Sequence, residues 1–228
     1  MKITFVGHSC FYIEGSKTIL IDPFLEGNPL TSKKPADFTP DYILVTHGHS
    51  DHIGDAVQIA RSCGAPIVAT VELVRWLEGE GILTIGFNQG GTVDLDGVKV
   101  KMVPAMHGSD IQTKTGYQYA GLACGYLIDI DDHLLYHAGD TGLFGDMGKV
   151  IGRRPLDIAC LPIGGYYTMD PADALTATHW LKAKTVIPMH YNTFPNIRQD
   201  ADAFAEAVEN KTESNCEVLY PGEFLLLE

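Results

Sequence analysis

Short runs of apolar residues recur along the whole chain, separated by glycine, proline and charged residues. Runs of about four to eight residues predict strands rather than helices. Residues 98–102 alternate apolar with charged side chains, which is typical of a strand with one face in water. The predicted strands cover residues 3–6, 11–13, 18–21, 43–45, 67–69, 98–103, 122–130, 134–136, 158–161, 186–188 and 224–227.

Four segments between these runs show helical spacing instead. The first covers residues 53–60 and precedes Gly64, which suits the end of a helix. The second runs from Thr70 to about residue 78. Two more begin after Asp170 and Asp200, residues that favour the N-cap position. The side chains that we expect to face inward from the second helix are Leu73, Trp76 and Leu77.

The order of these elements predicts a mixed architecture. Early strands joined by tight turns, followed by strands that alternate with helices, indicate α/β (α+β) structure with mixed sheets covered by helices. At 228 residues the chain can bury one large core, and no segment resembles a linker. We therefore expect a single domain over residues 1–228.

Several classes of protein are disfavoured by composition. No apolar run approaches the roughly 20 residues that a membrane-spanning helix needs, and no export signal precedes the first predicted strand, so we expect a cytoplasmic protein. The five cysteines are scattered, which favours reduced, packed thiols. A net charge of −13 argues against nucleic acid and anionic lipid as partners. A small-molecule substrate is the expected partner, and a homo-oligomer is left open.

The densest chemical signal follows the predicted strand 43–45. His47, His49, Asp51 and His52 lie within six residues of one another. Nitrogen and oxygen donors at this density are costly to leave unpaired beside a core, which favours a metal as their partner. A His-x-His segment places two rings together, and the next two donors leave in another direction. One segment can therefore supply two neighbouring ions.

The remaining candidate ligands each follow a predicted strand. His107 follows strand 98–103, Asp140 follows strand 134–136, and His190 follows strand 186–188. Strand ends are where loops bring distant side chains together. A consistent division gives one ion His47, His49 and His107, the other ion Asp51, His52 and His190, and Asp140 as a bridge between them.

This donor set indicates a catalytic centre with two divalent metal ions. Histidine and aspartate suit zinc first, with manganese or iron as alternatives. Each ion keeps an open position for a shared water or hydroxide, as a catalytic rather than a structural site does. Two divalent ions, two aspartates and one hydroxide sum to about +1, which favours electron-rich or anionic substrate groups.

The ordered set from His47 to His190 resembles the metallo-β-lactamase superfamily over almost the whole chain. The resemblance implies a four-layer αββα sandwich with two metals at one edge. Finer features are similar to a group of small metal-dependent hydrolases related to the ascorbate-6-phosphate lactonases; these are Gly7-His8-Ser9, Ile21-Asp22-Pro23-Phe24, Pro162-Ile163-Gly164-Gly165 and His190-Tyr191-Asn192. Asp140 stands where lactamases usually have cysteine, and His49 where oxygen-reducing members usually have glutamate. Both of those activities are therefore disfavoured.

The leading hypothesis is a dinuclear metal-dependent hydrolase in which a metal-bridging hydroxide cleaves an ester or lactone. Asp51 and Asp140 are the candidate catalytic carboxylates, and Asp51 is a candidate to orient the hydroxide or shuttle its proton. The alternatives are a phosphodiesterase of the same superfamily and a non-catalytic metal-binding sensor.

Further residues are candidates for supporting roles. His8 is a candidate to reach the pocket, and Asp22 or Asp55 to orient ligand histidines from behind. Arg198 is a candidate anion clamp, and residues 164–168 and 192–194 are candidate pocket linings. The long polar segment 108–119 is interpreted as a mobile cover over the substrate. His133, beside Asp131 and Asp132, is interpreted as a turn residue, and His137 and His179 as structural.

Overall fold

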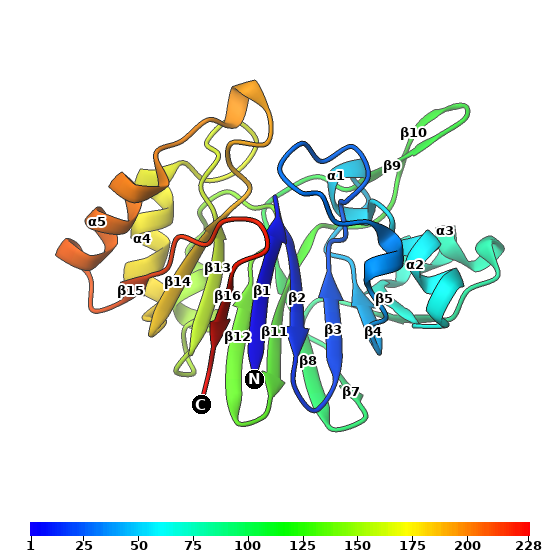
Figure 1. The fold of residues 1–228 in the computed structure, drawn as a ribbon, viewed down its shortest axis with the longest axis horizontal. Coiled ribbons are helices and arrows are strands. Elements are labelled where there is room, and N and C mark those ends of the chain that lie inside the picture. Colours follow the sequence, from blue (N-terminus) through cyan, green and yellow to red (C-terminus); the bar gives the residue numbers. More distant parts are fainter.

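Two seven-stranded mixed sheets pack face to face in the computed structural model, which describes residues 1–228 (Figure 1). In order across the first sheet, the strands are β16 (Phe224–Leu226), β1 (Lys2–Gly7), β2 (Cys10–Glu14), β3 (Thr18–Ile21), β4 (Tyr42–Leu44), β5 (Ile67–Thr70) and β6 (Thr84–Phe87). In order across the second sheet, they are β15 (Asn215–Cys216), β14 (Thr185–Met189), β13 (Ile158–Pro162), β12 (His133–His137), β11 (Cys124–Ile130), β8 (Val98–Pro104) and β7 (Thr92–Leu95).

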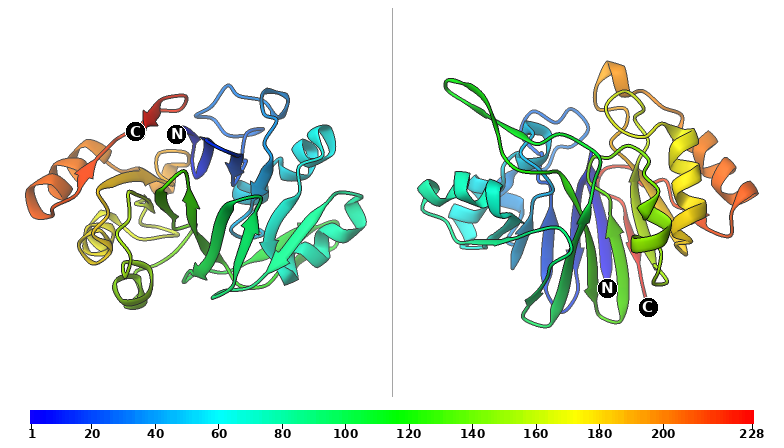
Figure 2. Two further views of the ribbon diagram at one scale, coloured as in Figure 1. Left: turned by 90° about the horizontal axis from the view of Figure 1, so that it is seen from below. Right: turned by 180° about the vertical axis from the view of Figure 1, so that it is seen from behind.

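Helices cover the outer side of each sheet. The helices on the side of the first sheet are α1 (Ser50–Ile53), α2 (Ala56–Cys63) and α3 (Val71–Leu77), and those on the side of the second are α4 (Pro171–Leu181) and α5 (Ala201–Lys211). Figure 2 shows these two groups flanking the sheets. The result is the four-layer αββα sandwich that the sequence resemblance implied. None of the helices has the length and continuous apolar character required to cross a bilayer.

The strand before the histidine cluster is buried on both faces. Leu44 packs in the cluster between the two sheets, whereas Ile43 and Val45 pack against α2 and α3 on the other side. Side chains alternate between the two faces of a strand, so a strand covered on both sides needs an uninterrupted apolar run. Packing on both faces therefore fixes the position of the segment that leads into His47.

The predicted strands and helices are confirmed, with small shifts at their ends. Asp170 and Asp200 each accept the expected capping hydrogen bond from a backbone amide, and the Thr70 side chain also caps α3. The prediction for Trp76 was wrong, because its side chain is 37% exposed and its Nε1 donates to the carbonyl of Tyr119 at 3.3 Å. Strands β6 and β7 were not predicted, since they are short and mostly half-exposed.

The polar segment after His107 forms a hairpin of β9 (Asp110–Thr113) and β10 (Gly116–Tyr119). It is a separate two-stranded sheet that projects from the body of the molecule (Figures 1 and 2). The side chains of β10 are all exposed. In this structure the segment is therefore an arm directed into solvent rather than a cover.

Candidate metal centre

Loops from both sheets converge at one edge of the sandwich. His47 follows β4, and His107, Asp140 and His190 follow β8, β12 and β14 of the second sheet. A fifth loop contributes His8, between β1 and β2. The backbone amide of His190 donates to the carbonyl of His8 at 2.8 Å, which links the two sheets directly at this edge.

The first group of donors consists of His47, His49 and His107. One ring nitrogen from each of the three lies within 4.8 Å of those from the other two. Nε2 of His47 is 3.0 Å from Nδ1 of His49, and the ring of His107 lies 5.1 Å from the ring of His49 between centroids. The structure therefore brings together the three histidines that the sequence assigned to one ion.

The second group consists of Asp51, His52 and His190, joined by His8. One donor atom from each of the four lies within 4.8 Å of the others. Oδ2 of Asp51 is 3.2 Å from Nε2 of His8 and 3.8 Å from Nε2 of His190. His8 is completely buried, and its ring lies 4.1 Å from that of His190 between centroids. The sequence suggested that His8 reaches the pocket, and the structure places it inside this group.

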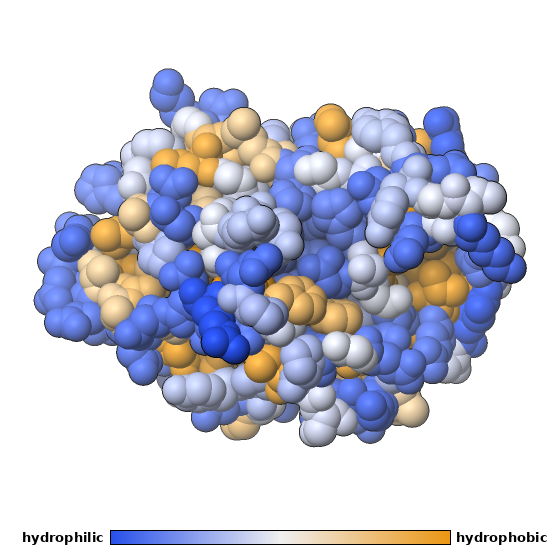
Figure 3. Space-filling view, turned by 90° about the horizontal axis from the view of Figure 1, so that it is seen from above, coloured by the Kyte–Doolittle hydropathy of each residue, from blue (hydrophilic) through white to orange (hydrophobic).

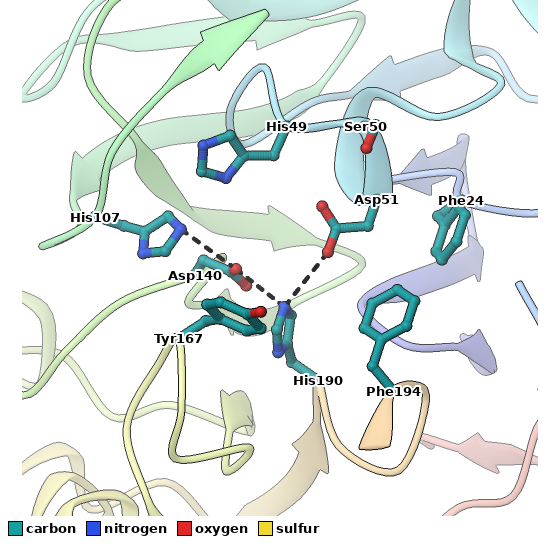
Figure 4. A pocket seen from close by; sticks show the side chains of 9 residues that line it. All are labelled: Phe24, His49, Ser50, Asp51, His107, Asp140, Tyr167, His190 and Phe194. Atoms are coloured by element: carbon teal, nitrogen blue, oxygen red, sulfur yellow. Dashed lines mark ion pairs between the residues drawn. The ribbon is translucent and has the colours of Figure 1, made fainter. Parts of the chain in front are cut away.

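Asp140 lies between the two groups. Its Oδ1 is 3.2 Å from Nε2 of His52, and its Oδ2 is 3.0 Å from Nε2 of His190. The same Oδ2 is 3.6 Å from Nε2 of His107, which belongs to the first group. Figure 4 shows Asp140 between His107 and His190. The Asp140 carboxylate is therefore within 3.6 Å of nitrogens from both groups.

Several buried polar atoms at this edge have no hydrogen-bond partner. They are Nε2 of His52, Oδ1 of Asp140 and both ring nitrogens of His190; the ion-pair contacts at 3.0–3.2 Å between these side chains lack the alignment of hydrogen bonds. An unsatisfied buried polar group costs about 1–3 kcal/mol, so native proteins rarely leave several together. Of these atoms, Nε2 of His52, Nε2 of His190 and Oδ1 of Asp140 lie close together and form a donor set for a cation. The residues present therefore fit the divalent ions that the sequence indicated.

A hydrogen-bond network behind the site fixes the histidine tautomers. Asp22, fully buried, accepts from the amide and the hydroxyl of Thr46 at 2.8 and 2.7 Å. Because that hydroxyl donates to Asp22, it accepts from Nδ1–H of His47 at 3.0 Å. Asp22 also accepts from Nδ1–H of His52 at 2.8 Å. In both rings the lone pair is thereby left on Nε2, facing the site.

Burial and charge set the protonation of the donors. Burial holds the pKa of His47 well below its usual value and also lowers the pKa of His107, so both are neutral at pH 7. Burial alone would raise the pKa of Asp140, but the charges of His190 and His52 outweigh it and hold that pKa well below its usual range. Asp51 follows the same pattern: the hydrogen bond from His8 and the charge of His52 outweigh burial and lower its pKa.

His52 shows that the site attracts positive charge. Burial would lower its pKa, but Asp140 and Asp22 outweigh burial and raise the pKa well above its usual value. The two carboxylates therefore favour positive charge at Nε2 of His52, which a bound cation would supply.

Three residues of the site have backbone conformations that are rare for side chains other than glycine. The φ angles are +60° at His8, +45° at Asp22 and +55° at His190. Each such conformation costs of order 1 kcal/mol or more and persists only where the surroundings impose it. The loops at this edge are therefore shaped by the geometry of the site.

The other supporting candidates have separate roles. Asp55 contacts no histidine, and instead accepts from the amides of Leu25 and Glu26, both at 2.9 Å. Arg198 is exposed and does not line the pocket. The interpretation of His137 as structural is confirmed, because its buried ring bonds to the carbonyl of Ser9 at 2.9 Å.

The donor groups open into a pocket of about 540 Å³. Its lining consists of Phe24, His49, Ser50, Asp51, His107, Asp140, Tyr167, His190 and Phe194 (Figure 4). Seen from above this edge, the surface is hollowed and hydrophilic near its centre, with hydrophobic surface beside it (Figure 3). The suggestion that segments 164–168 and 192–194 supply lining is confirmed for Tyr167 and Phe194. No residue of 108–119 lines the pocket, so the predicted cover is not seen.

The fold and the site together define a class of protein. A family profile described as "Beta-lactamase superfamily domain" matches residues 2–190. This match spans most of the chain, and the chain belongs to the metallo-β-lactamase superfamily.

Within that superfamily the relatives are metal-dependent hydrolases. The chain is 51% identical to a "UPF0173 metal-dependent hydrolase" of Pelotomaculum thermopropionicum over 100% of both chains. It is 48% identical to a protein of the same description from Thermococcus onnurineus, again over 100% of both. Among solved structures it is similar to Igni18, a metallo hydrolase from Ignicoccus hospitalis, with 38% identity, a TM-score of 0.91 and coverage of 100% and 98% of the two chains. The protein is therefore a metal-dependent hydrolase with His/Asp metal-binding clusters.

Proposed function

We propose that this protein binds two divalent metal ions, zinc first among them, and hydrolyses an ester or lactone of a small molecule. His47, His49 and His107 would hold one ion and Asp51, His52 and His190 the other, with Asp140 placed to contact both. The observation that carries the proposal is the convergence of buried donor atoms of His52, Asp140 and His190 at one edge of the sandwich, beside clusters whose ligand atoms lie within 4.8 Å of one another.

Ions bound there would supply Lewis acidity for the carbonyl oxygen and would lower the pKa of a water molecule toward neutrality. Asp51 orients the attacking water and transfers its proton. Its Oδ2 is held by His8 at 3.2 Å, and its side chain is 25% exposed and lines the pocket (Figure 4). Since its pKa is low, the carboxylate is ionised at neutral pH and can accept a hydrogen bond from the attacking water. It is the residue best placed to orient the attacking water.

The reaction balances with water as the only co-reactant. The water oxygen forms a bond to the acyl carbon, and the bond between that carbon and the ester oxygen breaks. One proton of the water passes through Asp51 to the departing alkoxide, and the products are a carboxylic acid and an alcohol, joined in one molecule when the substrate is a lactone. No serine or cysteine nucleophile is needed, and the cysteines support this because Cys10, Cys124 and Cys160 are buried with raised pKa values.

Substitutions at Asp22 and Thr46, which lie behind the site, are expected to change the metal affinities of the two sites differently. Asp22→Asn removes the acceptor that fixes His52 directly and His47 through Thr46, so we expect both sites to lose affinity by about 10–100-fold. Thr46→Val interrupts only the branch to His47 and is expected to weaken one site. Isothermal titration of metal into the stripped variants measures this difference.

Asp55→Asn is the matched control, because Asp55 accepts only from backbone amides of the 24–26 loop. It should bind both ions as the wild type does. Equal affinity in Asp22→Asn and wild type would contradict the assigned role of Asp22.

We expect both activity and stability to fall in acid. The pKa of His8 is lowered to about 4, from a value near 6.5 in the unfolded chain, chiefly by burial. Between these values the unfolded chain binds a proton that the folded chain does not, so stability decreases as the pH falls from 6.5 to 4. The lowered pKa values of His47 and His107 act in the same direction.

Protons also compete with metal for the same histidine nitrogens. A profile of kcat/KM from pH 8 to 5, measured with metal in excess, should fall below about pH 6. A rate that stays constant down to pH 5 would contradict histidine ligation.

An assay of purified protein against generic esters, lactones and phosphodiesters, with and without added Zn²⁺ or Mn²⁺, tests the reaction itself. We expect metal-dependent turnover of carboxylic esters or lactones. Turnover restricted to phosphodiesters would favour a phosphodiesterase, and two bound ions without any turnover would favour a sensor.

A further inference from the structure

Most polar residues that line the pocket are proposed metal ligands, and most of the remaining lining residues are aromatic. Among its polar lining residues, only Ser50 and the hydroxyl of Tyr167 lie outside the proposed metal ligands. The other lining residues are Phe24 and Phe194. The part of a substrate that lies away from the reacting bond is therefore left to meet mainly aromatic side chains.

Phe24 and Phe194 form one continuous apolar surface. Their rings are 6.3 Å apart between centroids and inclined by 32°. Each ring also meets the ring of His8 edge-on, at 5.7 and 5.6 Å. Figure 4 shows both phenylalanines on the side of Asp51 away from His49 and His107. A third ring between them would need about 7 Å, so a substrate group lies against the pair rather than between its members.

The loop that carries Phe24 is firmly held. Asp55 binds the amides of Leu25 and Glu26, and the amide of Asp55 donates to the carbonyl of Pro23 at 2.8 Å. At Gly54 a Cβ atom would lie 2.8 Å from Cα of Phe24, so only glycine permits this approach of the backbone. The backbone contacts therefore fix the position of Phe24 in the pocket lining.

The loop that carries Phe194 is fixed in the same way. Asn192 and Gln199 exchange two hydrogen bonds, at 2.9 and 3.1 Å, which close the loop across seven residues. Thr193 is buried, with its hydroxyl 2.8 Å from Nδ1 of His8. The ring of Phe194 remains half-buried at the pocket. Two loops from different sheets are thus built to present two rings at one place.

The pocket lining contains no lysine or arginine. Arg198, which follows the second loop, is exposed and outside the lining. A phosphate or carboxylate on the distal part of a substrate would lose hydration here without gaining an ion pair. An uncharged apolar group would instead cover two half-exposed rings.

We propose that Phe24 and Phe194 form a subsite for an uncharged, apolar acyl group adjacent to the reacting carbonyl. The inference rests on the ester or lactone hydrolysis proposed above, and it separates the substrate from phosphorylated sugar lactones. The metal ligands hold the carbonyl end, and the two rings select the substituent.

The test uses the metal-loaded, full-length protein with 4-nitrophenyl acetate, butanoate and hexanoate, and with the anionic 4-nitrophenyl hemisuccinate. We expect kcat/KM to rise about threefold for each added methylene, in line with the burial of apolar surface. The hemisuccinate should be hydrolysed about tenfold more slowly than the butanoate, since its charge finds no partner.

Variants locate the effect. Phe194→Ala and Phe24→Ala should lose more activity on the hexanoate than on the acetate, which flattens the dependence on chain length. Phe194→Leu keeps an apolar side chain and should preserve most of it. Phe224→Ala, at an exposed phenylalanine of β16, is the matched control and should behave as the wild type. Metal content, measured for each variant, should be unchanged.

The outcomes separate this inference from the function on which it rests. Metal-dependent hydrolysis of esters with no chain-length dependence, or with preference for the hemisuccinate, would overturn the apolar subsite and leave the hydrolase intact. A chain-length dependence that survives in both alanine variants would also overturn it. Absence of turnover with every ester would contradict the proposed function and the subsite together.

Discussion

Replacement of Asp140 by alanine is expected to reduce kcat/KM by about a thousandfold or more, and to lower the metal content of the protein at the same time. A metal centre contributes several kcal/mol to the stabilisation of transition-state charge, and about 4 kcal/mol corresponds to a thousandfold. The structure places the Asp140 carboxylate 3.0–3.6 Å from nitrogens of three histidines that belong to both donor groups. Its removal therefore affects both ions.

Metal analysis by mass spectrometry and steady-state kinetics on the same preparation measure the two effects. Asp132→Asn removes the same charge from an exposed turn and is the control; asparagine tolerates the positive φ found there. Full occupancy of two sites in Asp140→Ala would refute the bridging role.

Removal of metal is expected to lower the melting temperature by about 10–20 °C. An ion present at a hundred times its dissociation constant stabilises a fold by about 2.7 kcal/mol, and two such ions by about 5 kcal/mol. For a chain of this length, 1 kcal/mol corresponds to about 2–4 °C. Part of the effect arises because the ions satisfy the unpartnered atoms of His52, Asp140 and His190.

Differential scanning calorimetry before and after dialysis against a chelator measures the shift, and readdition of Zn²⁺ should restore it. Asp140→Ala serves as a comparison, since it should show a smaller shift. A change below about 2 °C in the wild type would indicate that no ion is bound at the predicted occupancy.

Most of the fold could be predicted from local patterns. The strands flanking the site, such as residues 43–45, are buried on both faces and therefore carry long apolar runs. Helices α4 and α5 begin after Asp170 and Asp200, N-cap residues that can be recognised in the sequence. The hairpin at 110–119 could not be predicted in the same way, because its strands are only four residues long, β10 is exposed and β9 is mostly half-buried. Its polarity suggested a cover, whereas the chain forms a projecting arm.

The site residues, like the elements of the fold, could be predicted where their signal is local in the sequence. The cluster from His47 to His52 is visible because its donors are adjacent in sequence, and the resemblance supplied the order of the distant ligands. The place of His8 depends on contacts with Asp51 and with Thr193, which lies 185 residues away, and no local pattern encodes them. Phe24 was missed as pocket lining for the same reason: its ring meets Phe194 only because loops from two sheets meet at one edge.

The most direct test of the account is a crystal structure of the metal-replete protein with anomalous scattering data at the metal absorption edge. We expect two anomalous peaks. One should lie within bonding distance of His47, His49 and His107. The other should lie within bonding distance of Asp51, His52 and His190, and Asp140 should contact both. A single peak, peaks elsewhere, or no anomalous signal at this edge of the sandwich would contradict the dinuclear hydrolase proposed here.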